Sequence, residues 1–174
     1  MKLYTNIITL TFTVFTLMSC QSKMAPNQEQ LQQQSAENVL PDFKMSHIGG
    51  GTISVKEEIT KHKITIVDFW ASWCSPCMQE VPSMVDLYNK YKNKGLGIIG
   101  ISLDKDEQTW KSTVESMHMN WTHVSDLQGW NNIAAQALGV NSIPFIIIVD
   151  NKGTILIAGL RGEEVGAFVT SRLN

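Results

Sequence analysis

The run Ile64–Trp70 is the feature that most constrains the fold of this chain. It is almost entirely apolar and is bounded by polar residues on both sides. A short apolar run without regular polar alternation is typical of a β-strand that is buried on both faces of its sheet. Such strands occur in sheets covered by helices, so the run predicts an α/β domain.

Helices and strands alternate around this strand. Lys44–Ile48 and Thr52–Val55 predict a small leading hairpin, with glycines 49–51 as its turn. After the buried strand we expect a helix over 75–92, a strand over 96–103, a helix over 106–117, a short strand over 121–124, a helix over 131–138, strands over 145–149 and 154–158, and a helix over 163–172. The turn at 150–153 makes the last two strands a hairpin. This order predicts a mixed sheet that is parallel in the middle and antiparallel at its end.

The N-terminal segment has a different character. The apolar stretch Ile7–Met18 is too short for an ordinary membrane-spanning helix and fits the hydrophobic part of a signal peptide. It ends at Cys20 in the sequence Leu-Met-Ser-Cys, which resembles the lipobox of bacterial lipoproteins, where the cysteine is acylated. We therefore expect a signal peptide over 1–19, a lipidated cysteine and flexible glutamine-rich tether over 20–38, and a folded domain over 39–174. A plain secretory signal, or a buried apolar N-terminal element, is the alternative.

Charge and cysteine count narrow the function. The net charge of −2 argues against a broad nucleic-acid surface. There are three cysteines, and lipid on Cys20 leaves Cys74 and Cys77 as a pair. A disulfide across two intervening residues closes too small a loop to stabilise a fold much. The pair is therefore interpreted as a chemical site.

The pair lies at the end of the buried strand, where a helix begins. The free N–H groups and the dipole of a helix N-terminus favour a thiolate at Cys74, and the thiolate is the nucleophile. We expect Cys74, at the exposed end, to attack a substrate disulfide, and Cys77, one turn deeper, to resolve the mixed disulfide. Pro76 suits the first helical turn. Trp73 is expected to pack beside the pair and shield it.

Metal binding is the alternative interpretation of a Cys-x-x-Cys sequence, because the motif is also half of a zinc site. No second pair of cysteines and no closely spaced pair of histidines completes such a site in this chain. We therefore expect neither a metal ion nor another cofactor.

Residues 68–82 resemble the active-site segment of thioredoxins, with Phe-Trp-Ala, Trp-Cys and Pro-Cys at the positions where that family has them. Ser142-Ile143-Pro144 resembles the cis-proline loop of the family, which lies against the cysteine pair and offers backbone groups to a substrate chain. The resemblance implies a thioredoxin fold in which Trp73, Pro76, Ile143 and Pro144 contact substrate. A simple proline at the start of a strand is the alternative for Pro144.

A closer similarity is to the exported TlpA/ResA-like branch of that family. Its marks are Leu-Pro-Asp-Phe at 40–43 and an additional helix and strand between about 102 and 124. This similarity implies a lipid-anchored thiol–disulfide oxidoreductase of the bacterial cell envelope that faces the periplasm. Its substrates would be protein disulfides, including apocytochromes as in the relatives, and a membrane electron donor would reduce it again.

Two carboxylates near the pair are candidate site residues. Asp68 lies inside the buried strand, where burial raises the pKa of a carboxyl group, and by similarity to thioredoxins it would carry the proton of Cys77. A hydrogen-bonded structural aspartate is the alternative. Glu80 lies one turn past Cys77, where ResA-like proteins carry an acidic residue; an exposed glutamate on the helix face is the alternative.

Two departures from the family bear on function. Phe145 follows the proline where relatives often have threonine, so substrate contacts there are expected to differ. No histidine lies between the cysteines, which favours a reductant over an oxidant.

A thioredoxin-like thiol peroxidase is the competing enzyme, although Ala71 stands where such enzymes have threonine. A lipoprotein that only binds a partner is the competing non-enzyme.

Overall fold

The computed structural model of the chain describes residues 38–174. The predicted signal peptide, Cys20 and all of the tether except Asn38 lie outside the described residues. Seven strands form one mixed sheet in the order β2-β1-β5-β4-β3-β6-β7. The strands are β1 (Lys44–His47), β2 (Thr52–Ser54), β3 (Ile64–Trp70), β4 (Leu96–Ser102), β5 (Thr122–Ser125), β6 (Phe145–Asp150) and β7 (Ile155–Ala158).

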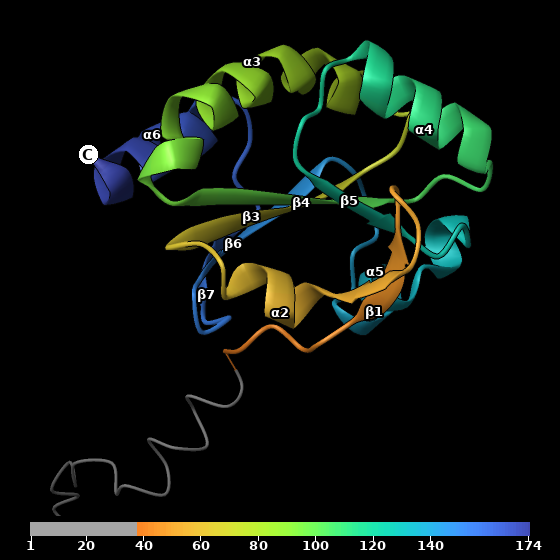
Figure 1. The fold of residues 1–174 in the computed structure, drawn as a ribbon, viewed down its shortest axis with the longest axis horizontal. Coiled ribbons are helices and arrows are strands. Elements are labelled where there is room, and N and C mark those ends of the chain that lie inside the picture. Colours follow the sequence, from red (N-terminus) through yellow and green to blue (C-terminus); the bar gives the residue numbers. More distant parts are fainter. Residues whose placement is uncertain (1–37) are drawn as a thin grey trace, which may run out of the picture.

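Within residues 38–174, five α-helices cover the sheet from both sides. They are α2 (Val55–Ile59), α3 (Ser75–Tyr91), α4 (Glu107–Ser116), α5 (Ile133–Ala137) and α6 (Glu163–Leu173). Helices α3, α4 and α6 lie over one face, and α2 and α5 lie over the other (Figure 1). This double cover explains why every residue of β3 and β4 is buried. No helix within residues 38–174 has the length and apolar content needed to cross a membrane.

The strand directions match the predicted mixed sheet. Strands β3, β4 and β5 are parallel, while β6 runs antiparallel to β3, and β7 to β6. Trp70 at the end of β3 pairs with Ser102 at the end of β4, and Phe69 pairs with Phe145 at the start of β6. The loops that follow β3 and β4 and the loop that precedes β6 therefore meet at one edge of the sheet. We call it the site edge.

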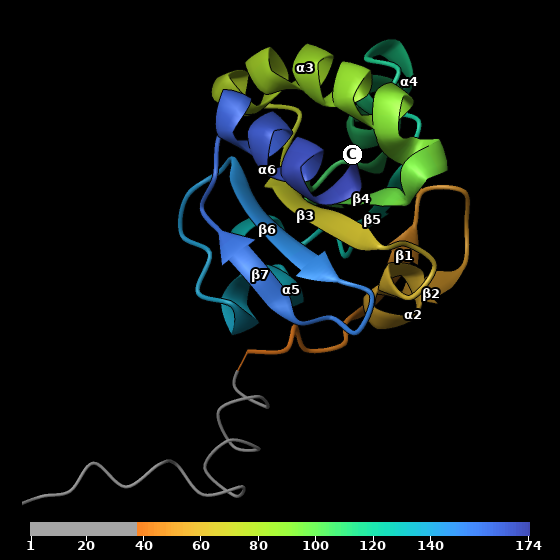
Figure 2. The same ribbon diagram turned by 90° about the vertical axis from the view of Figure 1, so that its left-hand side faces the viewer.

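The chain enters the domain at the opposite edge. The turn between β6 and β7 lies there, because Asp150 at the end of β6 pairs with Ile64 at the start of β3. The backbone N–H of Leu40 donates to the carbonyl oxygen of Gly153 in that turn at 2.8 Å, and the N–H of Ile155 donates to the carbonyl oxygen of Asn38 at 2.8 Å. The start of the described chain passes beside this turn (Figure 2).

Two short elements differ from the sequence prediction. Helix α2 was not expected, because its five residues are too few to show a helical pattern. The helix expected over 131–138 is divided into a 3-10 turn, η2 (Gly129–Asn131), and α5. Asn132 causes the division, because its backbone is not helical and its side chain accepts from the N–H groups of Ala134 and Ala135.

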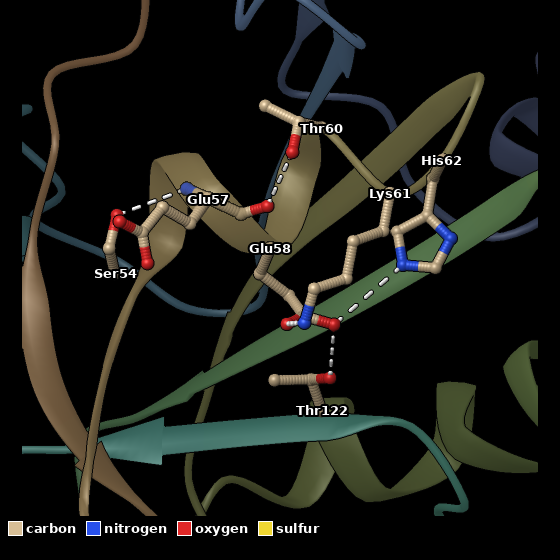
Figure 3. A network of polar contacts seen from close by, with 7 residues as sticks. All are labelled: Ser54, Glu57, Glu58, Thr60, Lys61, His62 and Thr122. Atoms are coloured by element: carbon tan, nitrogen blue, oxygen red, sulfur yellow. Dashed lines mark hydrogen bonds and ion pairs between the residues drawn. The ribbon is translucent and has the colours of Figure 1, made fainter.

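Polar contacts hold α2 in place (Figure 3). Ser54 caps the helix, since its Oγ accepts a hydrogen bond from the N–H of Glu57 at 3.0 Å. The carboxylate of Glu58 accepts from Thr122 Oγ1 on β5 at 3.1 Å and forms an ion pair with Lys61. These contacts join the polar side of the short helix to the sheet, while its apolar residues Val55 and Ile59 are buried in the core.

Gly100 allows close packing over the centre of the sheet. It lies in β4 between Asp68 on β3 and His123 on β5. The rings of Trp70 and His123 meet over it, with centroids 5.7 Å apart. A Cβ atom at position 100 would lie 2.5 Å from His123 Nδ1 and 2.9 Å from Trp70 Nε1, too close for either ring to stay in place.

We therefore predict that Gly100→Ala lowers the free energy of unfolding by about 1–3 kcal/mol, the usual cost of overpacking a core. Urea denaturation followed by circular dichroism measures this change. Gly166→Ala in α6 is the control, because nothing lies within 4 Å of the added Cβ, and it should be neutral or stabilise by up to about 1 kcal/mol. Equal stabilities of the two variants would contradict the packing argument.

Candidate active site

The cysteine pair lies at the site edge, where the chain passes from β3 into α3. Cys74 is the N-cap residue of α3, and its Sγ accepts a hydrogen bond from the backbone N–H of Cys77 at 3.2 Å. Cys74 and Cys77 form a disulfide with an S–S distance of 2.03 Å. The predicted location of the pair at a strand–helix junction is confirmed. An N–H group of the first turn thus points at the sulfur that would carry negative charge after reduction.

The predicted exposure of Cys74 is wrong for this disulfide form. The exposed fraction is 5% for Cys74 and 4% for Cys77, so the two residues are equally buried. The reason is local, because the Cys74 sulfur is bonded to the Cys77 sulfur and accepts a hydrogen bond from the Cys77 N–H, so it lies against the first turn of α3. Trp73, which was expected to shield the pair, is itself 55% exposed, and its ring packs against that of Trp130, with centroids 6.1 Å apart.

Asp68 is buried near the pair, and one of its two carboxylate oxygens lacks a hydrogen-bond partner within the described residues. This oxygen, Oδ1, is itself buried. Burial, and secondarily the negative charge of Glu80, raises the pKa of Asp68 from 3.8 to about 7. Between these values the folded protein keeps a proton that the unfolded chain loses. The contribution of Asp68 to stability therefore falls as the pH rises from about 4 to about 7.

A small cavity lies between Asp68 and Cys77. Asp68, Cys77, Glu80, Trp121 and Pro144 are among the residues that line it. The volume open to the centre of a water molecule is about 10 Å³, enough for about one water. Glu80 is half-buried and lies in the cavity wall. The structure thus brings together the two carboxylates and the proline that the sequence singled out.

The loop before β6 adopts the expected conformation. The peptide bond between Ile143 and Pro144 is cis, and Pro144 is buried. Phe145, the departure from the family pattern, is half-buried and packs against Phe69, with ring centroids 6.4 Å apart. Pro76 is exposed at the start of α3. Ile143 and Pro76 therefore lie on elements that meet at the site edge.

Asp104 is a residue of the site edge that the sequence analysis missed. The backbone N–H of Ser72 donates to both of its carboxylate oxygens at 3.2 Å, and Ser72 Oγ donates to Oδ1 at 2.6 Å. Ser102 Oγ donates to Oδ2 at 2.7 Å. This buried carboxylate joins the end of β4 to the loop that carries Cys74. Its position just after a buried strand, at the same edge as the cysteines, was the available signal.

His123 is a second buried group that the sequence did not identify. Its ring stacks on Trp121, with centroids 5.5 Å apart, and its Nε2 lies 3.1 Å from the carbonyl oxygen of Met119. Burial lowers the pKa of His123 to about 3, so the ring is neutral.

Within residues 38–174, no three histidine, cysteine, aspartate or glutamate side chains gather as metal ligands.

The contact between Asp104 and Ser72 gives a prediction for stability. We expect Asp104→Ala to lower the free energy of unfolding by about 1–3 kcal/mol, because it leaves buried donors without an acceptor. In a double-mutant cycle, Asp104→Ala and Ser72→Ala should show a coupling energy of about 0.5–3 kcal/mol. Asp106→Ala is the matched control, since its carboxylate caps α4 through Thr109. Asp106→Ala should not couple to Ser72→Ala. Similar coupling for both aspartates would contradict a specific contact between Asp104 and Ser72.

Comparison with known proteins bears on the same region. A family model described as thioredoxin-like matches residues 62–155. The thiol-disulfide oxidoreductase ResA of Bacillus cereus is 32% identical over 124 residues, which cover 71% of this chain and 70% of that protein. The matched span of the family model contains both cysteines and Pro144.

Solved structures resemble the fold described above. The thioredoxin domain of a thiol-disulfide oxidoreductase from Bacteroides vulgatus matches with a TM-score of 0.71 and 31% identity, over 78% of this chain and 96% of that one. A protein from Chlorobium tepidum, assigned as a thiol:disulfide interchange protein DsbE, matches with a TM-score of 0.67 and 26% identity, over 78% of this chain and 94% of that one.

Proposed function

The chain belongs to the thioredoxin-like family, and we propose that it is a thiol–disulfide oxidoreductase that reduces protein disulfides in the cell envelope through Cys74 and Cys77. One observation carries the proposal. The two cysteines form a disulfide at the N-terminus of α3, and an aspartate with a raised pKa lines the cavity beneath them. This arrangement has a nucleophile, a resolving thiol and a proton acceptor in one place.

The first step uses the reduced protein. The thiolate of Cys74 attacks one sulfur of a substrate disulfide, forming a mixed disulfide, and the second substrate sulfur leaves as a thiolate. The first turn of α3 favours this step, because the N–H of Cys77 points at the Cys74 sulfur. The leaving thiolate takes a proton from water.

The second step needs a proton to leave Cys77. The Cys77 thiol gives its proton to the Asp68 carboxylate, and the Cys77 sulfur attacks the Cys74 sulfur, which forms the Cys74–Cys77 disulfide. The substrate sulfur that was bonded to Cys74 leaves as a thiolate and takes a proton from water. Two electrons have then passed to the substrate. A pKa of about 7 suits Asp68 to this exchange near neutral pH. The charge of Glu80 helps to hold the pKa at that value.

Substrate contacts are assigned to the rim of the site. Ile143 and Pro144 offer backbone groups to the substrate chain, while Trp73 and Pro76 contribute exposed surface beside Cys74. Neither residue between the cysteines is a histidine, which supports a reductant over an oxidant. Ala71 is fully buried and has no hydroxyl group to offer Cys74. Thiol peroxidases have threonine at this position, so Ala71 argues against that activity.

The N-terminal sequence and the family support the proposed partners and location. Cys20 carries lipid, residues 20–38 tether the domain to the bacterial inner or outer membrane, and the domain faces the periplasm. Because the chain joins the domain at the edge opposite the site, the cysteine pair is directed away from the point of attachment. Substrates include apocytochromes, and a membrane electron donor reduces the Cys74–Cys77 disulfide after each cycle.

Cys77→Ser is the variant that tests the proposed function. It should accumulate mixed disulfides with envelope proteins, because Cys74 can still attack but nothing resolves the product. Non-reducing gels and mass spectrometry of an envelope extract detect these adducts. Cys74→Ser is the control and should yield none. Recovery of no adducts with Cys77→Ser would overturn the proposal.

Asp68→Asn tests the proton acceptor. In the wild type the rate of resolution should rise as the pH increases through about 7, because Asp68 must be ionised to accept the proton. In the variant the inflection near pH 7 should disappear, and resolution at that pH should be about 10²-fold slower, a typical effect of losing a general base. Quenched-flow measurement of the mixed disulfide between pH 6 and 9 checks this. Identical profiles for the two proteins would exclude the role.

Cys20→Ser tests the anchor separately from the chemistry. The substitution should move the protein from the membrane fraction to the soluble fraction, because the acyl methylenes buried in the bilayer are lost. The mass of the mature wild-type protein should show the added lipid. A Cys20→Ser protein that stays in the membrane fraction would rule out lipid as the anchor.

A further inference from the structure

We propose that a groove between Trp73 and Trp130 holds an apolar side chain of the substrate polypeptide, next to the cysteine that Cys74 attacks. The inference rests on the proposed function and specifies what the site recognises. We call this feature the tryptophan groove; its walls include Leu103, Lys105 and Thr109 as well as the two tryptophans. Its volume is about 400 Å³, within the range of pockets that take small ligands.

The distribution of exposed apolar side chains singles out this groove. Within residues 38–174 the large hydrophobic side chains that are exposed are Trp73 (55%), Trp130 (41%) and Ile133 (57%). Two of these three meet in a tilted pair beside the cysteine disulfide, with ring centroids 6.1 Å apart. They come from different loops, after β3 and after β5, so the pairing is a product of the fold. Adjacent exposed aromatic rings of this kind mark a binding surface.

The wall that carries Trp130 is built by specific contacts. The side-chain amide of Gln136 donates to the carbonyl oxygen of Trp130 at 2.8 Å. Gly129, before it, has a φ of 59° and leaves room for the stem of Lys105, whose Cε would lie 2.6 Å from an added Cβ. The methylene groups of Lys105 therefore cover the backbone where a side chain would stand, and they extend the apolar wall.

The occupant follows from the position of the groove. Trp73 precedes Cys74 directly, so a substrate whose sulfur reaches Cys74 places its neighbouring residues within reach of the groove, since adjacent Cα atoms are 3.8 Å apart. The carboxylate of Asp104 accepts hydrogen bonds from Ser72 and Ser102, and Asp104 is only 2% exposed, so it presents almost no surface to a ligand. The remaining charges at the groove, Lys105 and Asp106, balance each other. These features favour an apolar or aromatic side chain over a charged one.

Two disulfide-bonded peptides test the inference; they differ only in having phenylalanine or serine beside the cysteine. The reduced wild-type protein should reduce the phenylalanine peptide faster. Trp130→Ala should lower the second-order rate constant for that peptide by about tenfold, the effect of losing one aromatic contact. The rate for the serine peptide and for bis(2-hydroxyethyl) disulfide should stay within about twofold, because neither fills the groove.

Three further variants guard against indirect effects. Trp130→Phe should keep most of the preference, because it retains an aromatic ring. Trp130→Gln should lose it, and it serves as a second truncation if the alanine variant folds poorly. Ile133→Ala is the matched control, since Ile133 is also an exposed large apolar residue but does not line the groove. Thermal unfolding of each oxidised protein shows whether its fold is intact.

Each other outcome counts against the inference. Equal rates for the two peptides with the wild-type protein would overturn it directly. An equal loss on all three disulfides in Trp130→Ala would show that Trp130 supports the cysteine pair and not the substrate. A change in sedimentation of the free protein without a change in peptide preference would assign the surface to a second copy of the chain. If the wild type reduces no disulfide at all, the proposed function fails instead.

Discussion

The structure depends on the pairing of β3 with β4 on one side and β6 on the other. The helices on both faces bury β3 completely, and the pairing brings the ends of β3 and β4 and the start of β6 to one edge. The loops that carry Cys74, Asp104 and Pro144 then meet there without any further device. The carboxylate of Asp104 reinforces the meeting by binding the backbone and hydroxyl of Ser72, which fixes the cysteine loop against the end of β4.

The same burial supplies the chemistry. A carboxylate in the middle of a fully buried strand loses its hydration, and the pKa of Asp68 rises to about 7. Gly100 on β4, next to Asp68, has no side chain, so the rings of Trp70 and His123 can meet over β4. The buried Asp68 thus lowers the free energy of unfolding at neutral pH, at the position where the proposed reaction needs a proton acceptor. The rim of the site, in contrast, is open and apolar, with Trp73 and Trp130 exposed side by side.

Much of the fold was predictable from the sequence, and the reason is local. Apolar runs marked the strands, glycine and asparagine turns marked the hairpins, and the boundaries agree to within a few residues. The failures were also local in origin. Helix α2 has too few residues to show a period, and Asn132 divides a predicted helix by capping its second half. The exposure of Cys74 depended on where its sulfur points, which an N-cap geometry decides and a pattern does not show.

The sequence by itself determined the cysteine pair, its place at a strand–helix junction and the aspartate six residues earlier, because these groups are close along the chain. The tertiary structure alone decided which distant residues join them. Asp104 reaches Ser72, and Trp130 reaches Trp73, only because strand pairing brings separate loops to one edge. It also decided how deeply Asp68 is buried and that Glu80 lies in the same cavity wall. Burial and charge at a site are sums over neighbours from the whole fold, whereas a motif records only neighbours in sequence.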